Sequence, residues 1–234
     1  MTITIHDLDA VDAVVEPYDW AFPVAHHDAI EAYWEQTAAG RPGFFNGTVL
    51  VQHRGIIEGR VFRAGYSTAE YKHFLGYLRL EHPMRDVRNG FGMAALRAAD
   101  GAFLLGEMGP DTANAGMIYF AAGTPDLGDV VDGRLDLGAS VIREMCEETG
   151  LAPGDVTIAD GWTCLLFDRR AAFMRRVTID LPADEARRLM LDRMKALHED
   201  ELSDIVIIRP GFDAADPRMP AYMARYMERE FARG

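Results

Sequence analysis

The chain has 234 residues, of which 49% are apolar and 26% are charged, and its formal net charge is −13. This composition is typical of a globular protein that buries a sizeable core, and it excludes an intrinsically disordered chain. The acidic excess argues against nucleic-acid or anionic-membrane partners, because both recruit Lys and Arg to neutralise phosphates. A small phosphorylated ligand stays compatible, since a bound cation can reverse the local sign of the charge.

The lack of a recognisable targeting signal and the small number of cysteines predict a cytoplasmic protein. The first residues lack the basic head and apolar run of a signal peptide, and no apolar stretch is long enough to span a bilayer. Two cysteines, Cys146 and Cys164, provide neither a disulfide framework nor zinc-ligand spacing, and we interpret both as thiols in a reducing compartment. A homodimer is compatible with the sequence, which does not determine the oligomeric state.

Residues 1–87 are predicted to form an N-terminal extension rich in β-strand. A Gly- and Pro-containing break at 40–43 separates an apolar helical pattern from the alternating segments that follow. The expected elements are a helix over 28–34, strands over 47–53 and 57–63, and a helix over 68–75 that begins at a Ser67 or Thr68 cap.

Residues 88–234 are predicted to form a second domain that mixes strands and helices. Apolar runs at 91–98 and 102–108 flank Asp100-Gly101, which is a good hairpin signal. Further strands are expected over 116–122, 156–158, 163–167, 173–181 and 205–208, and helices over 182–194 and 220–231. This order predicts an α/β (α+β) fold in which a mixed sheet lies between helices.

Three carboxylates are concentrated in residues 143–151. Glu144, Glu147 and Glu148 stand at i, i+3 and i+4, so a helix projects all three side chains from one face. Like charges at this spacing repel one another, and either solvent or a cation must compensate them. A hard divalent ion fits best, because Mg²⁺ prefers oxygen ligands and is usually shared with substrate phosphates.

The ends of this helix are also marked in the sequence. Asp136 is a suitable N-cap, and Gly150 suits the left-handed position at which many helices end. Arg143 precedes Glu147 by four residues and can pair with it, which would hold that carboxylate in one rotamer. The segment therefore predicts an ordered acidic helix.

Residues 143–151 resemble the second half of the Nudix box, which reads Gly, five residues, Glu, seven residues, Arg-Glu, an apolar residue, any residue, Glu-Glu, any residue, Gly and an apolar residue. Every specified position from Arg143 to Leu151 matches. The first half differs, because Leu135 stands where the pattern has Glu and Asp129 stands where it has Gly.

A longer loop accounts for the variant first half. If Gly123 takes the part of the first Gly, Arg143 follows it after 20 positions where the pattern has 14, so the loop has gained about six residues. Asp126, Asp129 and Asp132 are the candidates to replace the missing Glu, and the sequence leaves the choice among them open.

The resemblance implies a Nudix α/β/α sandwich with a mixed β-sheet and an N-terminal β-rich extension, which makes residues 88–234 the catalytic domain. It also implies that Mg²⁺ or Mn²⁺ is held against a diphosphate while water attacks phosphorus. Carried over position by position, the metal ligands would be Glu144, Glu147 and Glu148, with the carbonyl of Gly123 as a further one.

The catalytic residues implied by the resemblance are Arg143, Glu144, Glu147 and Glu201. Arg143 would orient the glutamates. The general base would be either a box glutamate or a residue of a later loop, where Glu201 is the candidate and residues 198–199 lie nearby. Positioning and charge neutralisation would then supply most of the catalysis.

The resulting interpretation is a hydrolase that acts on a nucleoside diphosphate linked to another moiety. The phrase Phe-Leu-Gly at 74–76 weakly resembles the N-terminal extension of Nudix enzymes that act on UDP-sugars, which favours a nucleotide sugar. Arg97, Tyr119 and Phe120 are candidates for substrate contacts, but an aromatic residue of a strand usually belongs to the core, and no substrate-binding residue is assigned.

Two other functions compete with this interpretation. A ligand-binding or sensor domain without turnover is the alternative, and Leu135 in place of the box Glu favours it. The isomerase branch of the family needs a cysteine facing the substrate, whereas Cys164 is better explained as a buried strand residue.

Overall fold

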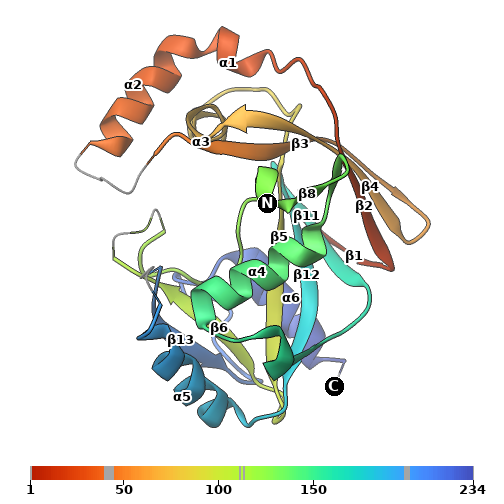
Figure 1. Cartoon of the computed structure of the whole chain (residues 1–234), viewed down its shortest axis with the longest axis vertical. Helices are drawn as coiled ribbons and strands as arrows, with labels where there is room; N and C mark the ends of the chain where they lie inside the picture. Colours follow the sequence, from red (N-terminus) through yellow and green to blue (C-terminus); the bar gives the residue numbers. More distant parts are fainter. Residues whose placement is uncertain (1, 40–44, 111, 113, 198–200, 234) are drawn as a thin grey trace.

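The computed structural model describes residues 2–39, 45–110, 112, 114–197 and 201–233, and the predicted break at 40–43 lies outside them. The described chain forms two β-sheets and a set of helices (Figure 1). The larger sheet contains β1 (Ile3–Leu8), β5 (Asn89–Ala98), β6 (Phe103–Met108), β7 (Ile118–Tyr119), β10 (Val156–Ile158), β11 (Trp162–Phe167), β12 (Arg170–Ile179) and β13 (Leu202–Ile208).

The smaller sheet and the helices complete the fold. The sheet contains β2 (Ala10–Val15), β3 (Thr48–Glu58), β4 (Val61–Glu70), β8 (Val130–Val131) and β9 (Arg134–Leu135). The helices are α1 (Phe22–Ala25), α2 (His27–Ala38), α3 (Tyr71–Arg79), α4 (Leu137–Thr149), α5 (Ala183–Met194) and α6 (Ala221–Phe231), with short 3₁₀ turns η1 (Leu127–Asp129) and η2 (Pro153–Asp155). Among the described residues, no helix is both long and apolar enough to cross a membrane.

Helices cover both faces of the larger sheet. Figure 1 shows α4 and α5 in front of it and α6 behind it. Side chains alternate along β5, so Met93 and Ala95 pack in the cluster that contains α6, and Ala94 and Leu96 in the cluster that contains α4 and α5. The sheet is mixed, because β5 runs parallel to β12 and antiparallel to β6. The predicted α/β/α sandwich with a mixed sheet is confirmed.

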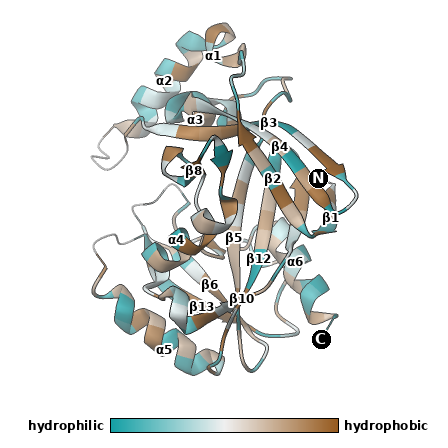
Figure 2. Ribbon diagram, turned by 45° about the vertical axis from the view of Figure 1, so that its right-hand side comes forward, coloured by the Kyte–Doolittle hydropathy of each residue, from teal (hydrophilic) through white to brown (hydrophobic). Residues whose placement is uncertain are grey.

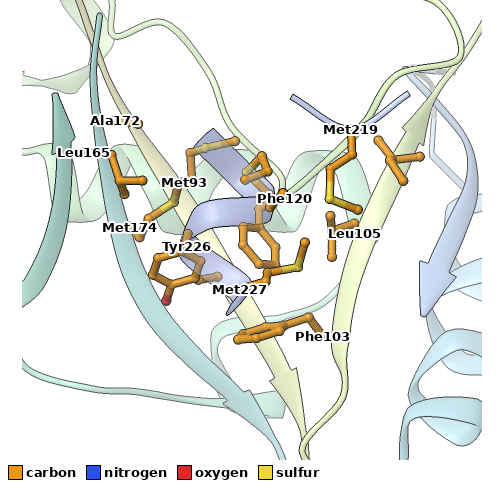
Figure 3. Packing of buried hydrophobic residues seen from close by; sticks show 14 of the residues in the cluster. Met93, Phe103, Leu105, Phe120, Leu165, Ala172, Met174, Met219, Tyr226 and Met227 are labelled. Atoms are coloured by element: carbon orange, nitrogen blue, oxygen red, sulfur yellow. The ribbon is translucent and has the colours of Figure 1, made fainter. Parts of the chain in front are cut away.

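Aromatic and methionine side chains join α6 to the sheet. Tyr226 and Met227 are fully buried beside Met93, Phe103 and Phe120 (Figure 3). The rings of Phe120 and Tyr226 meet edge to face with centroids 5.9 Å apart, an arrangement that favours aromatic packing. Hydrophilic and hydrophobic residues alternate around α6 in Figure 2, as expected of a helix with one buried face.

The structure corrects two predicted elements of the N-terminal extension. The break expected at residues 54–56, between the predicted strands 47–53 and 57–63, is absent. β3 continues through it to Glu58, and the chain turns at Gly59, whose φ is +61°. The helix expected over 68–75 does not begin at Ser67 or Thr68. Residues 68–70 pair with β3 as the end of β4, and these ladder hydrogen bonds outweigh the local capping preference.

Two strands of the N-terminal region were not predicted. β1 pairs antiparallel with β11 of the larger sheet, and β2 pairs in parallel with β4 of the smaller one. The smaller sheet in turn contains β8 and β9 from the loop before α4. Each sheet therefore includes strands from both sides of residue 88, and the division into 1–87 and 88–234 stays a prediction.

The strand expected over 116–122 is also shorter than predicted. Gly116 has a φ of +73°, and only Ile118–Tyr119 pairs with β6. The carbonyl of Ala121 then accepts a hydrogen bond from the amide of Ala94, 3.1 Å away, which brings the following loop beside β5. This loop leads to the acidic helix α4.

Candidate active site

Helix α4 begins and ends where the sequence predicts. The Asp136 side chain accepts a hydrogen bond from the amide of Ala139 at 2.9 Å, and Gly150 ends the helix with a φ of 71°. The three box glutamates differ in exposure. The side chain of Glu147 is 52% exposed and that of Glu144 is 15% exposed, whereas Glu148 is buried.

Glu148 has one satisfied and one unsatisfied carboxylate oxygen. Its Oε1 accepts a hydrogen bond from the amide of Ala122 at 3.1 Å, and its Oε2 is buried without a hydrogen-bond donor among the described residues. Burial raises the pKa of Glu148 well above its usual value, and the charges of Glu201 and Glu144 raise it further. Such an oxygen requires either a proton or a cation.

Glu144 lies directly against the backbone of Gly123. A Cβ atom at position 123 would stand 1.9 Å from Oε1 of Glu144, so a glycine is required for this approach. Burial raises the pKa of Glu144 to about 7, and the repulsion of Glu147 and Glu201 adds to this rise while Arg143 opposes it. Two box glutamates therefore have raised pKa values beside one loop.

Arg143 connects the loop to the acidic helix. Its Nη2 donates to both carboxylate oxygens of Asp129, at 3.0 and 3.1 Å. Its Nη1 pairs with Oε1 of Glu144 at 3.0 Å and donates to Oε2 of Glu147 at 2.9 Å. The predicted pairing of Arg143 with Glu147 is confirmed, and the same guanidinium fixes two glutamates.

Of the three loop aspartates, Asp129 is the one that pairs with Arg143. Its side chain is 3% exposed, and its Oδ2 accepts hydrogen bonds from Ser140 Oγ at 3.0 Å and from the amide of Asp126 at 3.2 Å. The side chain of Asp126 instead accepts from the amide of Gly128 and so caps η1. Asp132 occupies the turn between β8 and β9, with a φ of 49°.

Leu135 stands in the core and not beside the glutamates. It is 5% exposed and belongs to the same apolar cluster as Phe62, Leu137 and Phe173. Its strand β9 pairs with β8, where its partner is Val130. A carboxylate at position 135 would be buried among apolar side chains, which explains why the box Glu is absent here.

Glu201 reaches the acidic cluster from a different part of the chain. It lies just before β13, and its carbonyl accepts a hydrogen bond from the amide of Gly109 at 2.7 Å. Its charge contributes to the raised pKa values of Glu144, Glu148 and Tyr119. The structure thus brings this sequence candidate close to the box glutamates, while residues 198–199 lie outside the described residues.

A cavity of about 410 Å³, here called the α3 cavity, adjoins this cluster. Ala122, Gly123 and Tyr119 line it, and the first two also contact the box glutamates. Burial raises the pKa of Tyr119 to about 12, and the hydroxyl accepts a hydrogen bond from Asn114. The cavity therefore lies next to the carboxylates, which contact two of its lining residues but do not line it themselves.

The N-terminal extension forms one wall of the α3 cavity, which the sequence did not predict. Helix α3 contributes Tyr71, Phe74, Leu75, Leu78 and Arg79. Of the three candidates for substrate contact, Tyr119 lines the cavity. Phe120 is fully buried in the core, and Arg97 donates to the carbonyl of Gly101 in the hairpin.

The donor set is suited to a hard divalent cation. In the described part of the chain, no three His, Cys, Asp or Glu side chains are already arranged to hold a metal ion. Oε2 of buried Glu148, which has no hydrogen-bond partner among the described residues, and the raised pKa of Glu144 nevertheless indicate two carboxylates that a cation would stabilise. Oxygen donors of this kind favour Mg²⁺ or Mn²⁺ over softer ions.

No protein-family profile and no curated protein matches the chain. Among solved structures, it is similar to a Nudix hydrolase from M. smegmatis, with 16% identity and a TM-score of 0.41 over 62% of this chain and 84% of that one. The MutT protein from Methanosarcina mazei has 20% identity and a TM-score of 0.40, over 66% and 97% of the two chains. An Ap4A hydrolase from C. elegans has 15% identity and a TM-score of 0.42, over 61% and 96%. The assignment of a function therefore depends on the residues of the site itself.

Proposed function

We propose that this chain is a metal-dependent Nudix-type pyrophosphohydrolase, which cleaves the diphosphate bond of a nucleoside diphosphate linked to another moiety. The observation that supports it most is the buried, unsatisfied Oε2 of Glu148 beside Glu144, in the spacing of the Nudix box. A buried carboxylate beside a second, largely buried one is costly, and groups of this kind occur most often where a function requires them.

The proposed metal ligands are Glu144, Glu147 and Glu148, with the carbonyl of Gly123 as a further one. A bound Mg²⁺ or Mn²⁺ would neutralise charge on the diphosphate and lower the pKa of the attacking water. Gly123 is suited to this place because its missing side chain lets the Glu144 carboxylate approach the loop.

The chain's own residues position these groups and accept the proton. Arg143, itself held by Asp129, keeps Glu144 and Glu147 in fixed rotamers. A box glutamate, here Glu144, and Glu201 are the two candidates to accept a proton from the attacking water. Positioning of this kind supplies much of the rate enhancement in phosphoryl transfer.

A nucleotide sugar is the substrate that we favour. The Phe-Leu-Gly phrase of the extension lies on α3, and Phe74 and Leu75 of this phrase line the α3 cavity. A part of the extension is therefore in a position to contact the substrate. The alternative function is a sensor domain that binds the same ligand without cleaving it. Either function is compatible with the cytoplasmic location that we propose.

The test is release of phosphate or nucleotide from a panel of nucleoside-diphosphate compounds, measured with Mg²⁺, with Mn²⁺ and with chelator. We expect metal-dependent turnover in the natural protein and a loss of about 100-fold or more in Glu147→Gln, because an essential charge is removed. Glu185→Gln, on the exposed start of α5, is the matched control and should keep full activity. Metal-dependent ligand binding without turnover would support the sensor and contradict the hydrolase.

A further inference from the structure

Three aromatic side chains line one part of the α3 cavity. Phe167 and Tyr222 stack with ring centroids 4.6 Å apart and planes 18° apart, and Phe91 meets Tyr222 edge to face at 6.4 Å. All three line the cavity, which lies between α3 and the α6 face of the larger sheet. An aromatic lining of this kind favours a planar ligand ring, which can pack against aromatic side chains face to face or edge to face.

Two polar side chains stand next to each other on the same wall. Asn89 and Arg170 are the first residues of β5 and β12, and they are register partners in this parallel pair. Both line the cavity. The Oδ1 of Asn89 is buried and accepts no hydrogen bond from the described residues. The wall therefore contains a buried acceptor that lacks a partner among the described residues, beside a guanidinium.

The guanidinium of Arg170 is poorly compensated. Among the described residues its one ion pair is with Asp168, at 3.8 Å, which is too long for a hydrogen bond. Burial lowers the pKa of Arg170, and the nearby charges of Arg79 and Arg169 lower it further. Arg79 also lines the cavity. Although the chain has a net charge of −13, this wall carries two guanidinium groups, which can only donate hydrogen bonds.

We propose that the α3 cavity binds a flat heterocyclic ring of the substrate, with Arg170 donating to a ring carbonyl and Asn89 Oδ1 accepting from the adjacent ring N–H. The site thereby selects a keto ring over its amino counterpart. An amino group would direct N–H donors at a guanidinium that can only donate, and it would leave buried polar groups unpaired. This inference rests on the proposed function, which places the diphosphate at the neighbouring carboxylates.

A second anionic group of the substrate is the competing occupant of this wall. A phosphate or carboxylate would pair well with Arg170 and Arg79, but it would place acceptor oxygens against the buried Oδ1 of Asn89, which is unpaired among the described residues. It would also leave the aromatic lining without a planar partner. The ring satisfies both the amide and the aromatic surfaces, so the observations favour it.

The experiment measures binding of nucleoside monophosphates by calorimetry in the presence of chelator. Uridine and cytidine 5′-monophosphate form one matched keto and amino pair, and inosine and adenosine 5′-monophosphate form the other. We expect the keto member of at least one pair to bind about tenfold tighter than its amino partner, and ribose 5-phosphate to bind more weakly than both. Asn89→Leu and Arg170→Met should remove the preference, whereas Arg225→Gln on the exposed side of α6 should keep it.

Several outcomes would overturn the inference. Equal affinities within both pairs, or a preference for the amino members, would do so. A third contrary result is that ribose 5-phosphate binds as tightly as the nucleotides and loses affinity in Arg170→Met. That result would identify an anion site. The comparison of the keto and amino nucleotides uses the natural protein, so it does not depend on whether the variants fold. Metal-dependent hydrolysis without a keto preference would contradict this inference and leave the proposed function intact. A keto preference without hydrolysis would support the inference and contradict the proposed activity.

Discussion

Nη2 of Arg143 donates hydrogen bonds to both carboxylate oxygens of Asp129, a residue of the enlarged loop before α4. Asp129 is buried, and the same guanidinium contacts the carboxylates of Glu144 and Glu147. We interpret Asp129 as the replacement for the absent box Glu, because it provides the buried anion that fixes Arg143. The enlarged loop brings this aspartate to the helix although its position in the sequence differs.

Replacing this anion should therefore reduce activity. In Asp129→Asn the side chain keeps its shape but loses the charge that holds Arg143, and we expect turnover to fall about 10- to 100-fold, the range typical of residues that orient metal ligands. Asp132→Asn is the control, because Asp132 lies in a turn with a φ of 49° that Asn tolerates. Equal turnover in both variants would contradict the assigned role of Asp129.

The buried charge of Glu148 should reduce stability when no metal is bound. Glu148→Gln keeps an oxygen for the amide of Ala122 but removes the charge, so we expect its Tm in chelator to be about 2–4 °C above that of the natural protein, or ~1 kcal/mol. Mg²⁺ or Mn²⁺ should raise the Tm of the natural protein and change that of the variant little. Differential scanning calorimetry measures both effects, and an equal metal response in the two proteins would argue against Glu148 as a ligand.

The contact between Gly123 and Glu144 should make position 123 intolerant of a side chain. In Gly123→Ala the new Cβ would displace the Glu144 carboxylate, and we expect at least about a tenfold loss of turnover. The Tm should change by less than about 2 °C, because the far end of a glutamate side chain can move. Gly154→Ala is the matched control, since a Cβ there meets no atom within 4 Å. Full activity of Gly123→Ala would show that this contact is dispensable.

Restoring the consensus Glu at position 135 should damage the protein. Leu135 is 5% exposed in an apolar cluster, so Leu135→Glu would bury a charge and should lower the free energy of unfolding by ~3 kcal/mol or more. Leu135→Met conserves the volume and should cost less than about 1.5 kcal/mol. Urea unfolding compares the two variants, and a stable Leu135→Glu with raised turnover would show that Asp129 does not replace the box Glu.

Asp7 should make the stability depend on acidic pH. Although burial opposes it, hydrogen bonds from Arg233 and Arg229 on the C-terminal side lower the pKa of Asp7 to about 2. A carboxyl group with a lowered folded-state pKa stabilises the fold above its unfolded value of 3.8, and this stabilisation disappears as the pH falls toward 2. After screening we expect Asp7→Asn to lose about 1 kcal/mol at pH 7 and little at pH 2. A constant difference across this range would contradict the assignment.

The acidic helix and the layered core could be predicted from local patterns. The spacing of Glu144, Glu147 and Glu148, the cap at Asp136 and the stop at Gly150 all follow from helical geometry, which depends on residues close in the chain. The hairpin at Asp100-Gly101 and most strands of the larger sheet carry the same kind of local signal.

Contacts between distant segments could not be predicted in this way. The pairing of β1 with β11 joins residues near the N-terminus to residues near 165, and the extension of β4 to Glu70 depends on its partner β3. Which of the three candidate aspartates of the loop pairs with Arg143 also depends on the conformation of the loop. In each case a ladder or a buried ion pair overrides a weak local preference.

By itself, the sequence determined the class of fold, the acidic helix and the type of chemistry that it suggests, because these depend on periodicity and on residue type. The tertiary structure alone decided that Leu135 is a core residue, that Glu201 lies near the box glutamates, and that α3 of the extension forms a wall of the α3 cavity. Burial and electrostatic coupling between segments far apart in the chain depend on how those segments pack, and no local pattern records that packing.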